Sequence, residues 1–124
     1  MTKKGSDMIK IEAIVREDAL EDVKSALLAA DIRGITVSQV MGCGTQMGRT
    51  QLVRGNKVST TMVPKIKFEI VVSSEQWANR AISAIREAAY SGEPGDGKIF
   101  SYNIDRAIRI RTGEEDVEAI TPAP

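Results

Sequence analysis

The residues best suited to chemistry form a short glycine-rich turn that ends in a lysine. In Gly95-Asp96-Gly97-Lys98, the glycines precede a lysine at the start of an apolar run. Bare backbone N–H groups in such a turn can point toward an anion. An ordinary turn closed by a solvated lysine has the same composition, so the turn alone is weak evidence for anion binding.

A pair of arginines strengthens the anion interpretation. Arg109 and Arg111 stand two residues apart in segment 107–111, which reads as extended chain. Side chains at this spacing point the same way, roughly 6–7 Å apart, which is the span of a di- or triphosphate. The alternative is that the arginines form surface ion pairs with Glu114 or Glu115.

Segment 42–65 breaks the strand pattern on either side and reads as a long loop. It runs 24 residues with four glycines and ends at a proline and Lys65. Structureless connections beyond ~12–15 residues are uncommon in a compact domain, so a loop this long is typically a binding loop or a disordered linker. Between Gly44 and Gly48, the amide of Gln46 can coordinate a cation or a ligand, and Lys65 adds positive charge; a flexible polar hairpin is the alternative.

The loop matches neither standard phosphate-binding signature. Met47 stands where G-x-G-x-x-G requires glycine, and G-x-x-x-x-G-K-[ST] does not occur. Cys43 has no ready general base, because the chain contains no histidine, and a structural role is favoured for it. The sequence shows no set of residues arranged for hydrolysis, so it predicts a protein that is not an enzyme.

Length and charge narrow the remaining possibilities. The 124 residues allow one domain with an ordinary hydrophobic core. Seventeen basic and seventeen acidic residues cancel, so no overall charge draws the chain to nucleic acid or to an anionic membrane. A single cysteine excludes an intrachain disulfide, and no run of ~18 apolar residues occurs. A soluble, cytoplasmic protein is expected.

Apolar periodicity predicts an alternating order of strands and helices. Strands are expected at 9–16, 32–41, 65–72 and 99–104, and helices at about 20–30 and between residue 73 and Gly92. The expected capping boxes are Asp18 with Glu21 and Ser73 with Gln76. Residues 1–8 are expected to form a flexible leader, 9–114 the domain and 115–124 an unassigned tail.

Two strand–helix–strand units in one sheet predict an α+β, ferredoxin-like βαββαβ sandwich. The antiparallel sheet would carry both helices on one face, with the long loop between its second and third strands. The other face of the sheet must then meet solvent or a partner.

Seven segments, in order and at nearly the right spacing, resemble the PII nitrogen-regulatory signalling family, of the type associated with ammonium transporters. The resemblance covers roughly 9–114. The segments are I-E-A-I-V-R (11–16), G-I-T-V-S-Q-V (34–40), G-C-G-T-Q-M-G-R-T (42–50), V-R-G (53–55), V-P-K-I-K-F-E-I-V-V (63–72), G-D-G-K-I-F (95–100) and A-I-R-I-R-T-G-E (107–114).

The resemblance implies a homotrimer with nucleotide sites for ATP or ADP in the clefts between subunits. The uncovered sheet faces would turn inward toward the three-fold axis. Phosphates would be held by Gly95, Asp96, Gly97 and Lys98 of one subunit and by Arg109 and Arg111 of its neighbour. The resemblance also implies that the nucleotide contacts Ile14, Thr36, Gly42, Gly44, Gln46 and Lys65, of which the first three line the adenosine pocket.

The same resemblance makes segment 42–65 the T-loop of the family. Gln46 would ligate Mg²⁺ on ATP, and Lys65 would pair with a carboxylate of 2-oxoglutarate. Arg54 would stand at the loop tip, where many members contact an ammonium channel from the cytoplasmic side. Recruitment to the membrane by this transporter partner, or regulation of an enzyme of nitrogen metabolism, would follow.

Two positions depart from the family pattern. Thr45 replaces an arginine that many members carry beside the glutamine, which removes a charge directed at the phosphates. Val58 stands at the position of the uridylylated tyrosine, so control by uridylylation is not expected. Hydroxyl residues at 59–61 offer another place for modification.

The leading hypothesis is a non-catalytic trimeric sensor of ATP or ADP, with Mg²⁺ and 2-oxoglutarate as further ligands. The alternative within the family is a divergent sensor of the adenylate ratio or of another small anion, acting on a different transporter or enzyme. An acylphosphatase-like enzyme has no matching phosphate-loop motif here. An RNA-binding module of this topology would need a basic surface, which the neutral charge does not provide.

Overall fold

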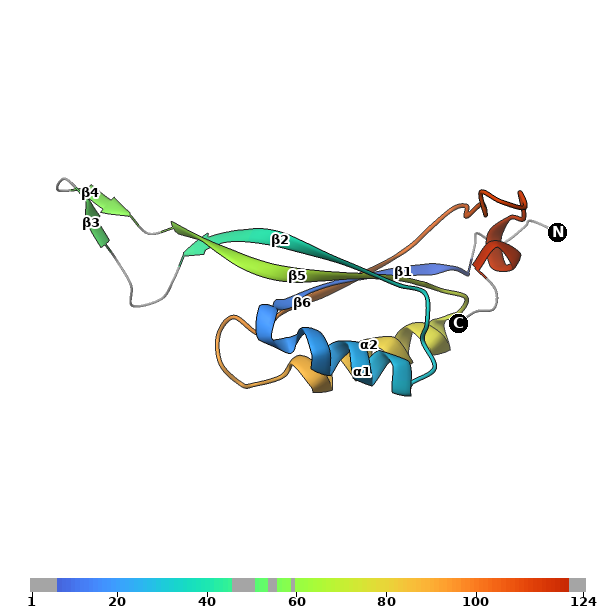
Figure 1. Cartoon of the computed structure of the whole chain (residues 1–124), viewed down its shortest axis with the longest axis horizontal. Coiled ribbons are helices and arrows are strands. Elements are labelled where there is room, and N and C mark those ends of the chain that lie inside the picture. Colours follow the sequence, from blue (N-terminus) through green and yellow to red (C-terminus); the bar gives the residue numbers. More distant parts are fainter. Residues whose placement is uncertain (1–6, 46–50, 54–55, 59, 121–124) are drawn as a thin grey trace.

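The computed structural model describes residues 7–45, 51–53, 56–58 and 60–120. Its main sheet has four strands in the order β2-β5-β1-β6, and each neighbouring pair is antiparallel (Figure 1). These strands are β1 (Ile9–Arg16), β2 (Ile35–Thr45), β5 (Thr60–Val72) and β6 (Gly97–Asn103). A separate ribbon pairs β3 (Gln51–Val53) with β4 (Asn56–Val58).

Two helices, α1 (Leu20–Ala29) and α2 (Glu75–Ala89), cover one face of the main sheet (Figure 1). The inner face of α2 is built largely from alanine, at positions 78, 81 and 89, together with Ile85. Small side chains at this spacing let the helix lie close to the strands. The ferredoxin-like fold predicted from the sequence is confirmed.

The core lies between the helices and the sheet. In β1, odd-numbered side chains are buried and even-numbered ones are half-exposed, which is the alternation expected of a strand covered on one side. Phe68, on the neighbouring strand β5, is fully buried at the centre of the same layer. The buried cluster comprises Ile9, Ile11, Ala13, Val15, Ala19, Val23, Leu27, Ile32, Ile66, Phe68, Ile70, Val72, Ala78, Ala81, Ile85 and Ala89.

Both helix starts differ from the predicted capping boxes. A 3-10 turn, Glu17–Ala19, leads into α1, and no side chain caps the first turn of the helix. Asp18 pairs with Arg16 instead. At α2, the cap is Ser74 rather than Ser73, since the Oγ of Ser74 accepts a hydrogen bond of 3.2 Å from the backbone N–H of Trp77.

Segment 42–65 is more regular than the predicted structureless loop. Strand β2 runs on to Thr45 and β5 begins at Thr60, and the two remain paired residue by residue to Thr45 opposite Thr60. Both strands extend past the helical layer as a two-stranded ribbon (Figure 1). Composition hid this extension, because glycine and polar residues break the alternation that marks a strand without preventing backbone pairing.

The last strand is also displaced from its predicted position, because β6 begins at Gly97 rather than at residue 99. Segment 107–111 is not extended as expected: Ile108 forms one isolated bridge with Glu115, and the N–H of Gly113 donates to the carbonyl of Arg109 at 2.7 Å. This tight turn is followed by a 3-10 helix, Asp116–Ile120.

Charges on the uncovered sheet face form a connected network. Lys10 Nζ lies 2.9 Å from Glu69, Lys67 Nζ lies 3.6 Å from Glu12, and the Tyr102 hydroxyl donates to Glu12 at 2.6 Å. The Tyr102 hydrogen bond lowers the pKa of the Glu12 carboxyl, and the hydrogen bond to Glu69 raises the pKa of Lys10. The opposite sign of neighbouring charges lets this face remain polar without net repulsion.

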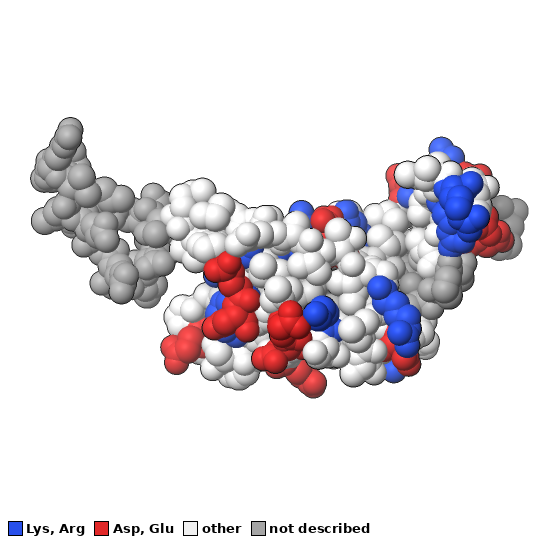
Figure 2. Space-filling model, in the orientation of Figure 1, with Lys and Arg blue, Asp and Glu red and all other residues white. Residues whose placement is uncertain are grey.

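Acidic and basic side chains are interspersed over the molecule. On the face shown in Figure 2, acidic side chains gather over the helical layer, while the extended ribbon next to the grey residues carries only uncharged side chains. Glu21 and Asp22 lie in the first turn of α1, where negative charge is favoured by the helix dipole.

Candidate functional site

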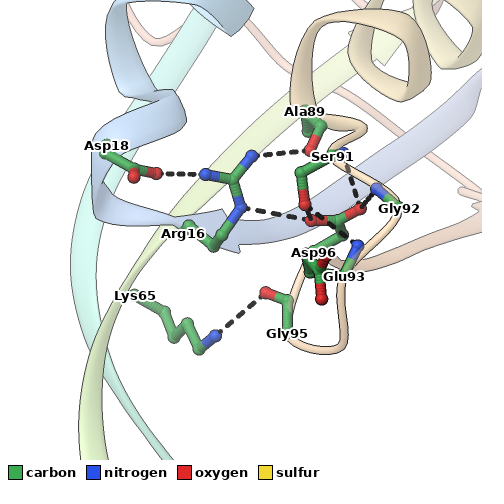
Figure 3. Close-up of polar contacts among 9 residues, drawn as sticks. All are labelled: Arg16, Asp18, Lys65, Ala89, Ser91, Gly92, Glu93, Gly95 and Asp96. Atoms are coloured by element: carbon green, nitrogen blue, oxygen red, sulfur yellow. Dashed lines mark hydrogen bonds and ion pairs between the residues drawn. The ribbon is translucent and has the colours of Figure 1, made fainter.

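The turn between α2 and β6 is organised around the carboxylate of Asp96 (Figure 3). Asp96 accepts hydrogen bonds from the backbone N–H of Ser91 at 2.7 Å, from the Ser91 hydroxyl, and from the N–H of Gly92 at 3.0 Å. These hydrogen bonds lower the pKa of Asp96 to about 2, and the one from the Ser91 side chain has the largest effect. The Asp96 carboxylate therefore holds the turn in shape with its own oxygens.

Arg16, at the end of β1, joins three separate parts of the chain at this turn. Its Nη2 donates to the carbonyl of Ala89 at 2.8 Å, its Nε lies 3.3 Å from Asp96, and its Nη1 pairs with Asp18 (Figure 3). Ala89 is the last residue of α2, where a positive charge is favoured by the exposed carbonyls. The guanidinium thus fixes the turn against both the helix and the sheet.

The two glycines of the turn differ in how strongly the structure requires glycine. Both have positive φ, +101° at Gly95 and +109° at Gly97, a region that side chains rarely occupy. A Cβ at Gly97 would also lie 1.9 Å from the carbonyl oxygen of Ile14, whereas nothing lies within 4 Å of a Cβ at Gly95. Gly97 is therefore required by the close approach of β6 to β1.

Lys65 and Lys98 bring positive charge to this end of the sheet. The Nζ of Lys65 donates to the carbonyl of Gly95 at 3.2 Å, which ties the start of the long ribbon to the turn (Figure 3). Lys98 is exposed, makes no ion pair within the described part of the chain, and stands opposite Ile14 in the β1–β6 register. The lysines and the turn make this end of the uncovered face able to hold an anion.

The residues predicted to contact adenosine lie on one face of the sheet but far apart along it. Ile14, Thr36 and Gly42 all occupy even-numbered strand positions, which face away from the helices. Thr36 and Gly42 are six residues apart on β2, so roughly 20 Å separates them. A single chain therefore does not assemble these three residues around one ligand.

The predicted arginines lie at the other end of the sheet from the glycine turn (Figure 1). Arg109 is held by the folded tail: its Nη1 lies 3.0 Å from Glu114, and its Nε and Nη2 donate to the carbonyls of Ala119 and Glu118 at 3.3 Å. Arg111 lies exposed in the tight turn that follows. The alternative of an ion pair between Arg109 and Glu114, weighed from the sequence, is thus present in the structure.

Several predicted residues fall outside the described residues, namely Gln46, Gly48, Arg54 and Ser59. Gly44 and Thr45 lie at the end of β2 and Val58 ends β4. Among residues 7–45, 51–53, 56–58 and 60–120, no group of three or more His, Cys, Asp and Glu side chains could hold a metal ion. The predicted roles of these residues stay predictions.

A cavity of about 410 Å³ lies beside the turn, on the helix side of the sheet. Its walls are mainly apolar and come from α2, β1 and β6, including Ile82, Ile85 and Ile99. Asp96, Gly97 and Lys98 also line this cavity, so it adjoins the glycine turn of the candidate anion site.

Sequence reasoning missed Arg16 and Ser91, which shape the turn without belonging to its glycine motif. Arg16 is 73 residues from Ala89, so no local pattern pairs them. Ser91 carries a weak signal, because a serine a few residues before an aspartate in a turn often shares hydrogen bonds with it.

Ser91→Ala is expected to raise the pKa of Asp96 above its value of about 2, because the side-chain hydrogen bond is its largest cause. In the wild type, the low pKa of Asp96 stabilises the folded state at pH values above 3.8, the ordinary pKa of this carboxyl group. This contribution to stability is lost as the pH falls toward 2. Carboxyl-carbon NMR titration measures the shift. Ser83→Ala, on the exposed face of α2, is the matched control; an equal shift in both variants would refute the assignment.

A four-stranded antiparallel sheet with two helices on one face and a long paired ribbon defines a class of small ferredoxin-like α+β proteins. The family Nitrogen regulatory protein P-II matches residues 8–114, and the chain belongs to this family. The P-II protein of Pasteurella multocida is 50% identical over 113 residues, covering 91% of this chain and 100% of the relative.

Two solved structures are similar over nearly the whole chain. The complex of Bacillus subtilis GlnK with ATP has a TM-score of 0.75 at 33% identity, covering 94% of this chain and 99% of its own. Arabidopsis thaliana PII bound to citrate has a TM-score of 0.70 at 41% identity, covering 92% of each chain. The family predicted from the seven sequence segments is confirmed.

Proposed function

We propose that this chain is a non-catalytic regulator that binds ATP or ADP in the clefts between the subunits of a homotrimer. The observation that carries the proposal is the separation of the anion-binding groups. The glycine turn and the arginines lie at opposite ends of one sheet (Figure 1). Two neighbouring copies could bring the turn of one beside the arginines of the other.

The chemistry of the turn supports a phosphate ligand. Gly95 and Gly97 are exposed residues whose positive φ is typical of turns that present backbone N–H groups to an anion, and exposed Lys98 makes no ion pair with another described residue. Charge-assisted hydrogen bonds contribute on the order of 1.5–3 kcal/mol each. Micromolar affinity requires about 8 kcal/mol in total, which a lysine and two arginines can largely supply. The relative solved as a GlnK–ATP complex supports a nucleotide as the ligand.

Mg²⁺ and 2-oxoglutarate are proposed as further ligands, through Gln46 and Lys65. An amide oxygen suits Mg²⁺, a hard cation that takes oxygen ligands. The ammonium of Lys65 rests on the Gly95 carbonyl, so it already reaches the turn from the ribbon. A metabolite carboxylate would accept from this ammonium more strongly than a neutral carbonyl does. Its binding would therefore release Lys65 from the turn and change the base of the T-loop.

The proposed partners are a membrane transporter of the ammonium-channel type or an enzyme of nitrogen metabolism. The ribbon extends beyond the helical layer, which places the base of the T-loop away from the body of the domain (Figure 1). Arg54 would contact the partner, and the transporter would recruit the protein from the cytoplasm to the membrane. No helix in the described residues is long and apolar enough to cross a membrane.

A sensor of the adenylate ratio or of another small anion is the second candidate. Thr45 favours it, because this residue carries no charge where many members have an arginine. The Arabidopsis relative bound to citrate shows that another family member takes a small carboxylate. Titration of 2-oxoglutarate into protein saturated with Mg-ATP distinguishes the candidates: binding supports the first, and its absence together with a response to the ATP/ADP ratio supports the second.

Calorimetric titration of the folded protein is expected to show binding of ATP and ADP. Gln46→Ala and Lys65→Ala should leave ADP binding largely intact and abolish 2-oxoglutarate binding in the presence of Mg-ATP. Lys24→Ala, an exposed lysine on α1, is the control for loss of charge. No heat with either nucleotide would refute the proposed function, whereas equal loss of both ligands would refute only the roles of Gln46 and Lys65.

A further inference from the structure

Three sulfur-containing side chains lie together on the extended part of the β2–β5 ribbon. Cys43 is a free, exposed thiol on β2, and Met41 and Met62 are 55% and 58% exposed. By contrast, Met8 is fully buried and serves as an ordinary core residue. Isolated exposed apolar residues are common, but three adjacent sulfur atoms at the surface need a separate explanation.

Strand pairing places the three side chains on one face. Cys43 stands directly opposite Met62, and Met41 stands two residues before Cys43, with continuous one-to-one pairing along this stretch. Directly opposed residues have Cβ atoms about 4.5–5.5 Å apart. Residues at i and i+2 on a strand are roughly 7 Å apart on the same face. The three flexible or short side chains can therefore converge on one point above the ribbon.

This face is the continuation of the core face beyond the helices. Odd-numbered residues of β2 and even-numbered residues of β5 face α1 and α2 along the body of the sheet, as Phe68 does. Past the end of the helical layer, the same face has no cover from the helices (Figure 1). The surrounding ribbon is uncharged on the face shown in Figure 2. The three sulfur-containing side chains are thus accessible to solvent.

We propose that Cys43, Met41 and Met62 form a binding site for Cu(I), a soft monovalent metal ion. Thiolate and thioether sulfurs select Cu(I), whereas Mg²⁺ and Ca²⁺ require oxygen ligands. On binding, the Cys43 thiol releases its proton to solvent, and the thiolate and two thioether lone pairs coordinate the ion. One positive charge meets one negative charge, so the bound site is neutral, and no electron is transferred.

Such a metal would connect β2 to β5 close to the base of the T-loop. Gly42 stands between Met41 and Cys43 on β2. Because successive strand positions alternate between faces, Gly42 belongs to the opposite face of the ribbon, where nucleotide binding is proposed. The sulfur site and the nucleotide site thus occupy opposite faces, and the metal proposal stands independently of the proposed function.

Competition with bathocuproine disulfonate under anaerobic, reducing conditions tests the site with Cu(I) itself. The full-length protein is expected to bind one Cu(I) per chain. Cys43→Ser should abolish this binding. Met41→Leu and Met62→Leu preserve side-chain volume, and each should weaken Cu(I) affinity at least about tenfold. Loss of a residue that only supports a metal ligand already has an effect of this size in other metal sites. An unchanged circular dichroism spectrum and thermal unfolding transition show that each variant is folded.

Two controls establish that the geometry, and not the thiol alone, makes the site. Met62→Leu combined with Val63→Met moves the thioether to the other face and should not restore affinity. In methionine-methyl NMR with Ag(I) as the probe, the Met41 and Met62 signals should shift while buried Met8 stays unchanged. Restoration by Val63→Met, no shift of the methionine signals, or unchanged affinity in both leucine variants would overturn the proposal.

Discussion

Gly97→Ala is expected to destabilise the domain by roughly 3 kcal/mol or more and to abolish nucleotide binding. A positive φ costs a non-glycine residue on the order of 1–2 kcal/mol. At Gly97 the added Cβ would also lie 1.9 Å from the Ile14 carbonyl oxygen, so β6 would have to move away from β1. That movement would break strand pairing and displace Lys98 from the candidate anion site. Chemical denaturation and calorimetry measure the two effects.

Gly95→Ala is the matched control for this substitution. Gly95 has a similar φ of +101°, but nothing lies within 4 Å of the position that its Cβ would take. This variant should therefore lose only the conformational contribution, about 1–2 kcal/mol, and should keep measurable nucleotide affinity. Equal destabilisation by both substitutions would show that steric contact with Ile14 is unimportant. Retained nucleotide binding in Gly97→Ala would refute the role of the turn.

Phe68→Ala is expected to reduce the free energy of unfolding by about 3–5 kcal/mol. Phe68 is fully buried on β5, between the flanking strands and the helices. Removing its ring reduces the apolar surface that folding buries, and it leaves a cavity that the surrounding strands cannot fill. Because native domains typically have a total stability of about 5–15 kcal/mol, this loss shifts the unfolding transition strongly.

Tyr90→Ala provides the control for loss of an aromatic ring. Tyr90 is 69% exposed just after α2, so the expected change is within about 0.5 kcal/mol. Both variants must be compared at one protein concentration, because the stability of the proposed homotrimer would depend on concentration. A small effect of Phe68→Ala would contradict the placement of this ring at the centre of the core.

Most of the fold could be predicted from local patterns. Alternation in residues 9–16 indicated a strand covered on one side, and the structure buries Ile9, Ile11, Ala13 and Val15 as that pattern requires. The predicted ends of the strands were less accurate where tertiary packing and the local sequence pattern disagree. The β2–β5 ribbon runs into the glycine-rich segment because backbone pairing depends on the partner strand and not on side-chain alternation.

The candidate site could be predicted only in part. The glycines and Lys98 of the turn were identifiable because their composition is local and unusual. The hydrogen bonds that the Asp96 oxygens accept from Ser91 and Gly92 were not predicted, because the motif alone does not show how the turn folds back on itself. The folded tail likewise engages Arg109 through contacts with Glu114 and two carbonyls that no spacing rule predicts.

The sequence by itself determined the family, the order of strands and helices, and which residue types stand in the glycine turn. Those features depend on chain-local periodicity and on short motifs. Only the tertiary structure decided that Arg16 joins β1 to the end of α2, that Lys65 reaches Gly95, and that the sulfur residues share an uncovered face. The physical reason is that these contacts join residues distant in sequence, whose proximity follows from strand register and helix placement.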